Sequence, residues 1–223
     1  MPRSPRVDIG NEIYHVINRA NARLPIFFKE EDFKLFENVL EEAKEKYNMR
    51  ILAYCLMPNH FHLVLYPKKD NDLQKFMQWI TLTHTQRWHI KNRTIGSGHL
   101  YQGRYKSFLI ERNNHLLSVI RYIERNPLRA KLVKKAENWG FSSLSYRLLK
   151  NSKKKLLSVW PIEEPKDYIS FVNTSQTNKE EESIRLSIIK SNPYGSDNWS
   201  MKIIKKFGLE STVRPKGRPR KGT

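Results

Sequence analysis

Residues 50–66 read RILAYCLMPNHFHLVLY, and this stretch decides the expected fold. The segments 50–57 and 60–66 are apolar and rich in residues that favour strands. Between them, Met57-Pro58-Asn59 is typical of a turn, because proline interrupts regular structure and asparagine tolerates unusual backbone dihedrals. The sequence therefore predicts two strands joined by a tight turn.

The segments around this pair show alternating strand and helix patterns. Strands are expected at 12–18 and 105–110, and helices at 30–47, at 71–91 and from Asn113 or Asn114 to Pro127. The resulting order is β-α-β-β-α-β-α. This order indicates a ferredoxin-like split β-α-β domain of the α+β class, with an antiparallel sheet and helices packed on one face.

The C-terminal third of the chain has a different character. Residues 128–150 predict short helices that complete the core, so we assign residues 1–150 to one domain. Residues 151–179 begin with a basic run and are then poor in pattern, which indicates a linker. Residues 180–223 predict a helical, basic extension with short helices at 180–189 and 198–207.

The 223 residues carry a formal net charge of +19, and the pI is near 10.0. Such an excess favours a polyanionic partner, although a solubilising lysine surface would give the same charge. No apolar run approaches the ~20 residues of a membrane-spanning helix, and the first residues lack the apolar core of a secretion signal. The single cysteine, Cys55, excludes an intramolecular disulfide and a cysteine-built zinc site. We expect a soluble, cytoplasmic, nucleoid-associated protein without membrane contacts.

His60-Phe61-His62 is the sharpest chemical signal in the sequence. Successive strand side chains point to opposite faces, so His60 and His62 share a face while Phe61 points into the core. Two imidazoles at this spacing are a candidate pair of metal ligands, and a divalent ion suits phosphodiester cleavage by a basic protein. The alternative is a pair of surface or hydrogen-bonded histidines without a joint role. The other histidines show no such pattern and are expected to be structural or exposed: His15, His84, His89, His99 and His115.

Tyr122 and Asn126 are the second candidate pair. Residues four apart on a helix lie on the same side, so both point the same way at the end of a helix closed by Pro127. The amide oxygen of Asn126 can complete a hard-metal shell, and the phenol of Tyr122 can serve as a hydroxyl nucleophile. The alternative for Tyr122 is a packed helix tyrosine.

Three motifs in this order make the chain resemble a known family. Met57-Pro58-Asn59-His60-Phe61-His62-Leu63-Val64 resembles the metal-binding strand of the single-tyrosine HUH transposases. It is most similar to that of the REP-associated tyrosine transposases. The segments 98–107 (GHLYQGRYKS) and 121–130 (RYIERNPLRA) match the same family, and the resemblance covers about residues 8–150.

The resemblance implies a mechanism and a substrate. His60, His62 and Asn126 would bind Mg²⁺ or Mn²⁺, although insertion-sequence relatives usually carry glutamine at the third position. Tyr122 would attack a phosphate of single-stranded DNA, which gives a 5′-phosphotyrosine link and a free 3′-OH for later rejoining. The implied substrates are hairpins from repetitive extragenic palindromes. The implied assemblies are monomers or homodimers that exchange tyrosine helices.

Basic residues near these motifs are candidates for DNA contacts. Arg104 and Lys106 alternate along a strand and could follow the DNA backbone. Arg121, Arg125 and Arg129 recur at helical spacing, which predicts a cationic ridge beside the site or, alternatively, a solvated helix face. The C-terminal end resembles an AT-hook for the minor groove of A·T-rich duplex DNA; the alternative is a basic tail without groove preference. Its candidate residues are Arg214, Lys216, Arg218, Arg220 and Lys221.

The leading hypothesis is a metal-dependent transposase-like enzyme that cleaves and transfers single strands of hairpin-bearing DNA. The second is a non-enzymatic DNA-binding protein that retains the fold. A plasmid replication initiator or relaxase is disfavoured, because those enzymes often carry a second tyrosine or a third histidine in the motif.

Overall fold

The computed structural model describes residues 6–149 and 156–214. At its centre, β2 (Arg50–Met57) and β3 (His60–Tyr66) pair antiparallel across the expected turn. β1 (Ile13–Arg19) pairs with the other edge of β3, and β4 (Lys106–Ile110) pairs with β1. The strand order is therefore β2-β3-β1-β4, and each strand lies within one residue of its predicted bounds.

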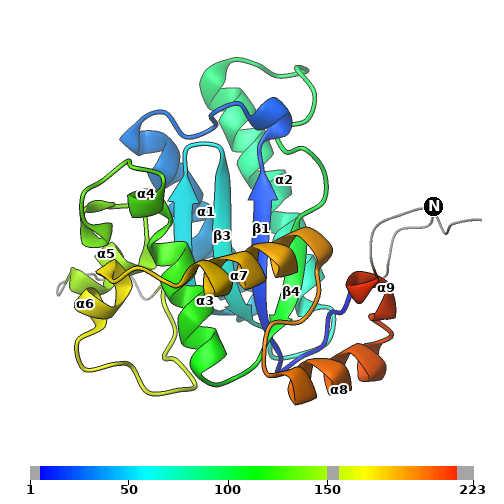
Figure 1. Ribbon diagram of the computed structural model, residues 1–223. Coiled ribbons are helices and arrows are strands. Elements are labelled where there is room, and N and C mark those ends of the chain that lie inside the picture. Colours follow the sequence, from blue (N-terminus) through cyan, green and yellow to red (C-terminus); the bar gives the residue numbers. More distant parts are fainter. Residues whose placement is uncertain (1–5, 150–155, 215–223) are drawn as a thin grey trace, which may run out of the picture.

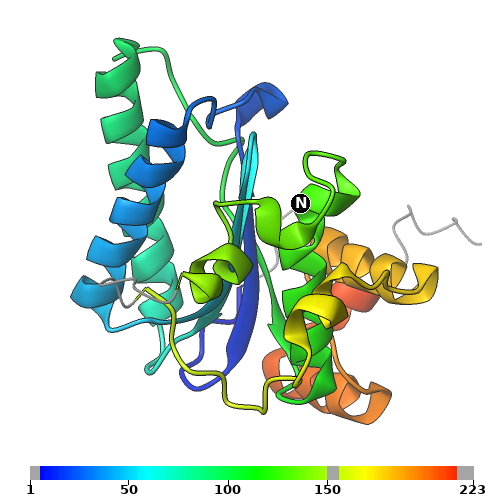
Figure 2. The ribbon, with the colours of Figure 1, turned by 90° about the vertical axis from the view of Figure 1, so that its left-hand side faces the viewer.

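Helices cover both faces of this sheet, so the prediction of helices on one face was wrong (Figure 2). α1 (Glu30–Tyr47) and α2 (Asp72–Asn92) pack on one face, and α3 (Asn114–Glu124) packs on the other (Figure 1). Each face has its own cluster of buried apolar side chains. The physical reason is that strands such as β2 bury residues on both sides, because apolar residues run along them without alternation.

The start of α1 is fixed by Asp32, whose carboxylate accepts hydrogen bonds from the backbone N–H groups of Phe28 (2.9 Å) and Lys29 (3.0 Å). The same carboxylate forms an ion pair with Lys91 of α2, so it also joins the two helices. Burial raises the pKa of this carboxyl. The Lys91 ammonium and the two backbone donors outweigh burial and hold the pKa below its usual value.

Short elements connect the larger ones. The turn after β1 contains η1 (Asn21–Arg23), and the chain after α3 forms α4 (Asn126–Arg129), η2 (Ala136–Asn138) and α5 (Ser143–Leu148). The segment before α5 lies along the outer edge of β2, where the N–H of Leu56 donates to the carbonyl of Phe141 (2.9 Å). The predicted short helices of 128–150 therefore do complete the core beside β2.

The described part of the predicted linker packs on the domain. Trp160 is buried, and its indole N–H donates to the carbonyl of Leu52 (2.8 Å). α6 (Tyr168–Asn173) follows, and Tyr168 and Val172 join the buried cluster on the α3 face. Because a few well-separated apolar residues provide this packing, the sequence shows no periodic pattern there, and residues 151–179 resemble a linker.

The described part of the C-terminal extension is helical, as predicted. It consists of α7 (Asn178–Lys190), α8 (Asp197–Phe207) and α9 (Glu210–Val213). α7 packs against α3 and β4, while Ile203 of α8 and Leu209 join the larger apolar cluster (Figure 1). The extension therefore shares its core with the sheet. Across residues 6–149 and 156–214, no helix is long and apolar enough to cross a lipid bilayer.

Candidate active site

His60 and His62 lie at the start of β3, on the face of the sheet that α3 covers. The centroids of their rings are 5.0 Å apart. His62 is buried, whereas His60 is partly exposed beside the turn, and its Nδ1 lies 2.6 Å from Oδ1 of Asn59. The two histidines share one face as predicted, and that face is enclosed by protein.

The side-chain amide of Asn126 faces both imidazoles. Asn126 is the first residue of α4, and only Arg125 separates it from the end of α3. Its side-chain Nδ2 lies 2.9 Å from Nε2 of His62 and 3.5 Å from Nε2 of His60. The structure thus brings together the three residues predicted as metal ligands.

Tyr122 lies one helical turn before Asn126, in α3. Its ring is edge-on to the ring of His62, with 6.5 Å between the centroids. Only 5% of the residue is exposed, and the guanidinium carbon of Arg129 lies 4.0 Å from the centre of its ring. The predicted nucleophile and the predicted ligands therefore meet within a single chain.

Both candidate histidine ligands are neutral near pH 7. Burial, with smaller effects from the positive charges of Arg19 and Arg129, lowers the pKa of His60 to about 4. Burial and the neighbouring His60 and His15 rings hold the pKa of His62 well below its usual value. A neutral imidazole is the form that can bind a metal, and burial favours this form for both rings.

The third donor is an amide rather than an acid. Within the described residues, no group of three or more His, Cys, Asp or Glu side chains could hold a metal ion. Two imidazoles lie at this point, and the Asn126 amide would add its oxygen if it turned over, because Nδ2 now faces the rings. Hard cations such as Mg²⁺ and Mn²⁺ accept oxygen ligands of this kind. The three residues are therefore a candidate ligand set for a divalent ion.

Comparison with known proteins agrees with this geometry. The family described as "Transposase IS200 like" matches residues 9–126, which is more than half of the chain. The chain belongs to the IS200-like transposase family. The matched region extends from just before β1 to Asn126, so all four residues of the site lie within it.

The chain is also similar to two REP-associated tyrosine transposases, one compared by sequence and one by structure. A Haemophilus influenzae protein, named as a candidate REP-associated tyrosine transposase, is 25% identical over 116 residues; these cover 48% of this chain and 66% of that protein. The solved structure of a REP-associated tyrosine transposase bound to a REP hairpin is 19% identical with a TM-score of 0.57. That match covers 79% of this chain and 99% of the other. The predicted α+β fold and the resemblance to this branch are confirmed.

Two of the three arginines in the predicted ridge form hydrogen bonds with the C-terminal part of the chain. Arg121 donates to Glu180 of α7 (3.1 Å), and its side chain is only 11% exposed. Arg125 donates to the carbonyl of Asn173 (3.4 Å) and to the hydroxyl of Ser175 (2.8 Å). The prediction of an exposed cationic ridge is wrong for Arg121 and Arg125, because α6, α7 and the segment between them pack over both side chains. The alternative, a solvated helix face, is wrong for the same reason.

Arg129 faces the site itself. One guanidinium nitrogen, Nη2, donates to Oδ1 of Asn126 (3.0 Å), and the guanidinium lies over the ring of Tyr122. The other, Nη1, is 3.8 Å from the carboxylate of Glu181 in α7. Arg129 thus connects the site to the C-terminal helices, a role that its spacing in the sequence did not indicate.

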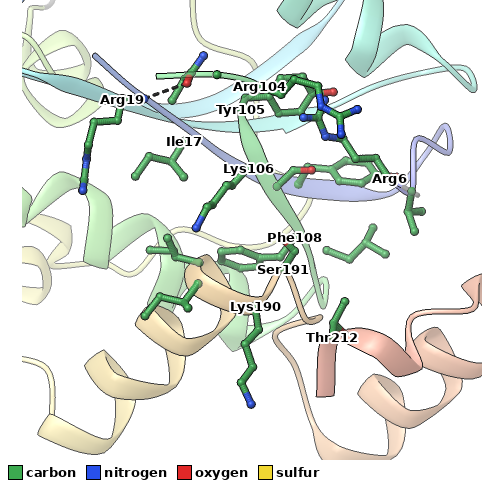
Figure 3. A pocket seen from close by; sticks show the side chains of 18 of the residues that line it. Arg6, Ile17, Arg19, Arg104, Tyr105, Lys106, Phe108, Lys190, Ser191 and Thr212 are labelled. Atoms are coloured by element: carbon green, nitrogen blue, oxygen red, sulfur yellow. Dashed lines mark hydrogen bonds between the residues drawn. The ribbon is translucent and has the colours of Figure 1, made fainter. Parts of the chain in front are cut away.

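A basic groove of about 820 Å³ lies beside the edge strand β4 (Figure 3). Lys106 begins β4, whereas Arg104 lies in the bend before the strand, so the two do not alternate within it as predicted. Both side chains nevertheless line the groove. The described lining residues include no Asp or Glu, and five of them are cationic: Arg6, Arg19, Arg104, Lys106 and Lys190.

His15 belongs to the site, although the sequence did not single it out. It is fully buried in β1, and its Nε2 lies 2.8 Å from Nδ1 of His62. The strand register pairs His15 with Val64, so His62 is its diagonal neighbour on the same face. This register between β1 and β3 is the property that brings the rings together, and no local pattern in either strand specifies it.

The candidate residues of the C-terminal tail are described only in part. Arg214 follows α9 and is exposed. Lys216, Arg218, Arg220 and Lys221 lie outside the described residues. The AT-hook-like contact with A·T-rich DNA stays a prediction.

Proposed function

We propose that this transposase cleaves and rejoins single-stranded DNA in a metal-dependent reaction, through a 5′-phosphotyrosine link to Tyr122. One observation carries the proposal: Nε2 of His60 and Nε2 of His62 face the same Asn126 amide, and the ring of Tyr122 lies 6.5 Å from that of His62. Family membership supports a DNA transposase, and this convergence supports the covalent route.

The cofactor we propose is Mg²⁺ or Mn²⁺, held by Nε2 of His60, Nε2 of His62 and Oδ1 of Asn126. In the described structure Nδ2 faces the imidazoles, so Asn126 would turn its amide over and release the hydrogen bond from Arg129. When bound, the ion would polarise the scissile phosphate and stabilise the charge that develops there.

Tyr122 would act as the nucleophile. Its phenolic oxygen forms a bond to phosphorus while the bond from phosphorus to O3′ breaks, and the phenolic proton passes through solvent to the leaving 3′ oxygen. Rejoining reverses the exchange, because the 3′-OH attacks phosphorus and releases Tyr122. Each step replaces one phosphate ester with another, so no nucleotide hydrolysis is needed. Arg129 would stabilise negative charge on the phenol, because its guanidinium carbon lies 4.0 Å from the centre of the Tyr122 ring.

The substrate we propose is hairpin-forming DNA from repetitive palindromes, because the structurally similar REP-associated tyrosine transposase is bound to a REP hairpin. The cations of the groove beside β4 would neutralise phosphates of the single strand, and the tail would hold nearby A·T-rich duplex. Since the four site residues come from one chain, Tyr122 would act in cis, either in a monomer or within each subunit of a homodimer. Such a substrate would keep the protein at the nucleoid.

Labelled hairpin oligonucleotides test this proposal. Incubation with Mg²⁺ or Mn²⁺ should give a covalent protein–DNA adduct that persists in denaturing gels and is lost with EDTA. Tyr122→Phe should abolish the adduct, whereas Tyr47→Phe, on α1 at the opposite face of the sheet, should retain it. Tight hairpin binding by the wild type without any adduct would contradict the proposal and favour the non-enzymatic DNA-binding protein.

A further inference from the structure

A chain of hydrogen bonds runs through the site from Arg129 to His15. Arg129 Nη2 donates to Oδ1 of Asn126 (3.0 Å), and Nδ2 of the same amide lies 2.9 Å from Nε2 of His62. On the far side of the His62 ring, Nδ1 lies 2.8 Å from Nε2 of His15. The chain thus links α4, β3 and β1.

Arg129 fixes the direction of every bond in this chain, because a guanidinium can only donate. It makes Oδ1 of Asn126 the acceptor, so the amide N–H donates to Nε2 of His62, which must be unprotonated. The ring proton of neutral His62 is then on Nδ1 and is donated to Nε2 of His15. His15 must therefore carry its own proton on Nδ1.

His15 leaves that proton without a partner. Its Nδ1 is buried and makes no hydrogen bond to any described residue. A buried N–H group without a partner is energetically unfavourable. The His15 ring packs against Phe108, with 4.8 Å between the ring centroids, and an apolar residue in its place would avoid this cost. The atom that His15 does use is Nε2, as an acceptor for His62.

We propose that His15 is a positioning residue, which holds His62 in the Nδ1–H tautomer and aims the Nε2 lone pair of His62 at the point shared with His60 and Asn126. The tautomer is a property of the metal-free protein. Its consequence for metal affinity rests on the proposed function. Metal-binding histidines commonly donate their other ring N–H to an acceptor, and loss of that acceptor typically costs 10–100-fold in affinity.

Nitrogen NMR of the histidine rings tests the tautomer directly in the metal-free full chain. The His62 signals are assigned by their loss in His62→Gln, and the wild type should show Nδ1 protonated and Nε2 unprotonated. His15→Gln retains an acceptor at a similar reach and should preserve this pattern. His15→Phe retains a ring without an acceptor, so the Nδ1–H of His62 is left unpaired. The Nε2–H tautomer, for which the Asn126 amide must turn over, should then become more populated than in the wild type. A wild-type His62 protonated at Nε2 would overturn the proposal, and this outcome does not depend on the folding of either His15 variant.

Titration with Mn²⁺ alone gives the second readout. His15→Phe should weaken Mn²⁺ binding roughly 10–100-fold, and His15→Gln should restore most of the affinity, with thermal unfolding confirming that both variants fold. An unchanged tautomer and unchanged affinity in folded His15→Phe would overturn the role of His15. If the wild type shows the expected tautomer and binds no Mn²⁺, the proposed function fails while the positioning of His62 by His15 is supported.

Discussion

Replacing Arg129 with methionine tests whether the contact from α4 to Tyr122 contributes to catalysis. Methionine fills the space of the aliphatic stem and carries neither charge nor donor. The substitution removes the 3.0 Å hydrogen bond to Oδ1 of Asn126 and the guanidinium that lies 4.0 Å from the centre of the Tyr122 ring. We expect hairpin cleavage to slow while hairpin binding stays close to that of the wild type.

The magnitude follows from the contact with the ring, because the hydrogen bond to Asn126 would already be released when the amide turns over to hold the ion. A cation over an aromatic ring contributes about 0.5–2 kcal/mol. The Arg129 side chain is 19% exposed, so solvent screens this contact only in part. If the whole contact acts in the transition state, the cleavage rate falls roughly 2–30-fold.

The assay is single-turnover cleavage of a labelled hairpin with saturating protein, together with hairpin binding measured by gel shift. Arg185→Met is the matched control, because Arg185 lies 2.9 Å from the same Glu181 that faces Arg129, and its side chain is 52% exposed on α7. The control should cleave at the wild-type rate. Wild-type cleavage by Arg129→Met, or equal losses in the two variants, would refute this reasoning.

Four further predictions concern stability and DNA binding. The lowered pKa of Asp32 means that its contribution to stability is present above the unfolded Asp pKa of about 3.9 and is lost as pH falls through the lower native pKa. Asp32→Asn should therefore reduce the free energy of unfolding at pH 7 by about 1–2 kcal/mol and flatten its acid dependence in urea denaturation. Trp160→Ala should destabilise the fold by about 3–5 kcal/mol in the same assay, whereas a change in a free linker would have no effect. Lys106→Gln should reduce the slope of log affinity against log salt by about 1, and Lys34→Gln on α1 should leave it unchanged. Deleting residues 214–223 should lower DNA affinity and flatten its salt dependence; an unchanged slope would contradict a role of the tail in DNA binding.

The residues of the site could be predicted because each pattern depends on the geometry of a single element. Alternation along β3 places His60 and His62 on one face, and the four-residue spacing places Tyr122 and Asn126 on one side of a helix end. α3 ends at Glu124, but Pro127 does not end helical structure: it lies in the first turn of α4, where a missing N–H leaves no hydrogen bond unmade. The histidine pair and the Tyr122–Asn126 pair come together because α3 packs on the face of the sheet to which the two histidines of β3 point. The three matching motifs of the family implied that meeting, and periodicity alone did not.

The features that the sequence did not predict all depend on contacts between different helices, strands or loops. The contact of His15 with His62 depends on the register of β1 against β3, which either strand alone leaves unspecified. Arg121 appeared free because its partner, Glu180, lies far along the chain in α7. The burial of Trp160 depends on one indole reaching the carbonyl of Leu52, and a single aromatic residue gives no periodic signal.

The most direct test of the covalent mechanism identifies the amino acid that becomes joined to DNA. The protein is incubated with a hairpin oligonucleotide and Mn²⁺, then digested with protease and nuclease, and the nucleotide-bearing peptide is sequenced by mass spectrometry. We predict a 5′-phosphate linked to the phenolic oxygen of Tyr122. A nucleotide on any other residue, or cleaved DNA without a linked peptide, would contradict the covalent role of Tyr122.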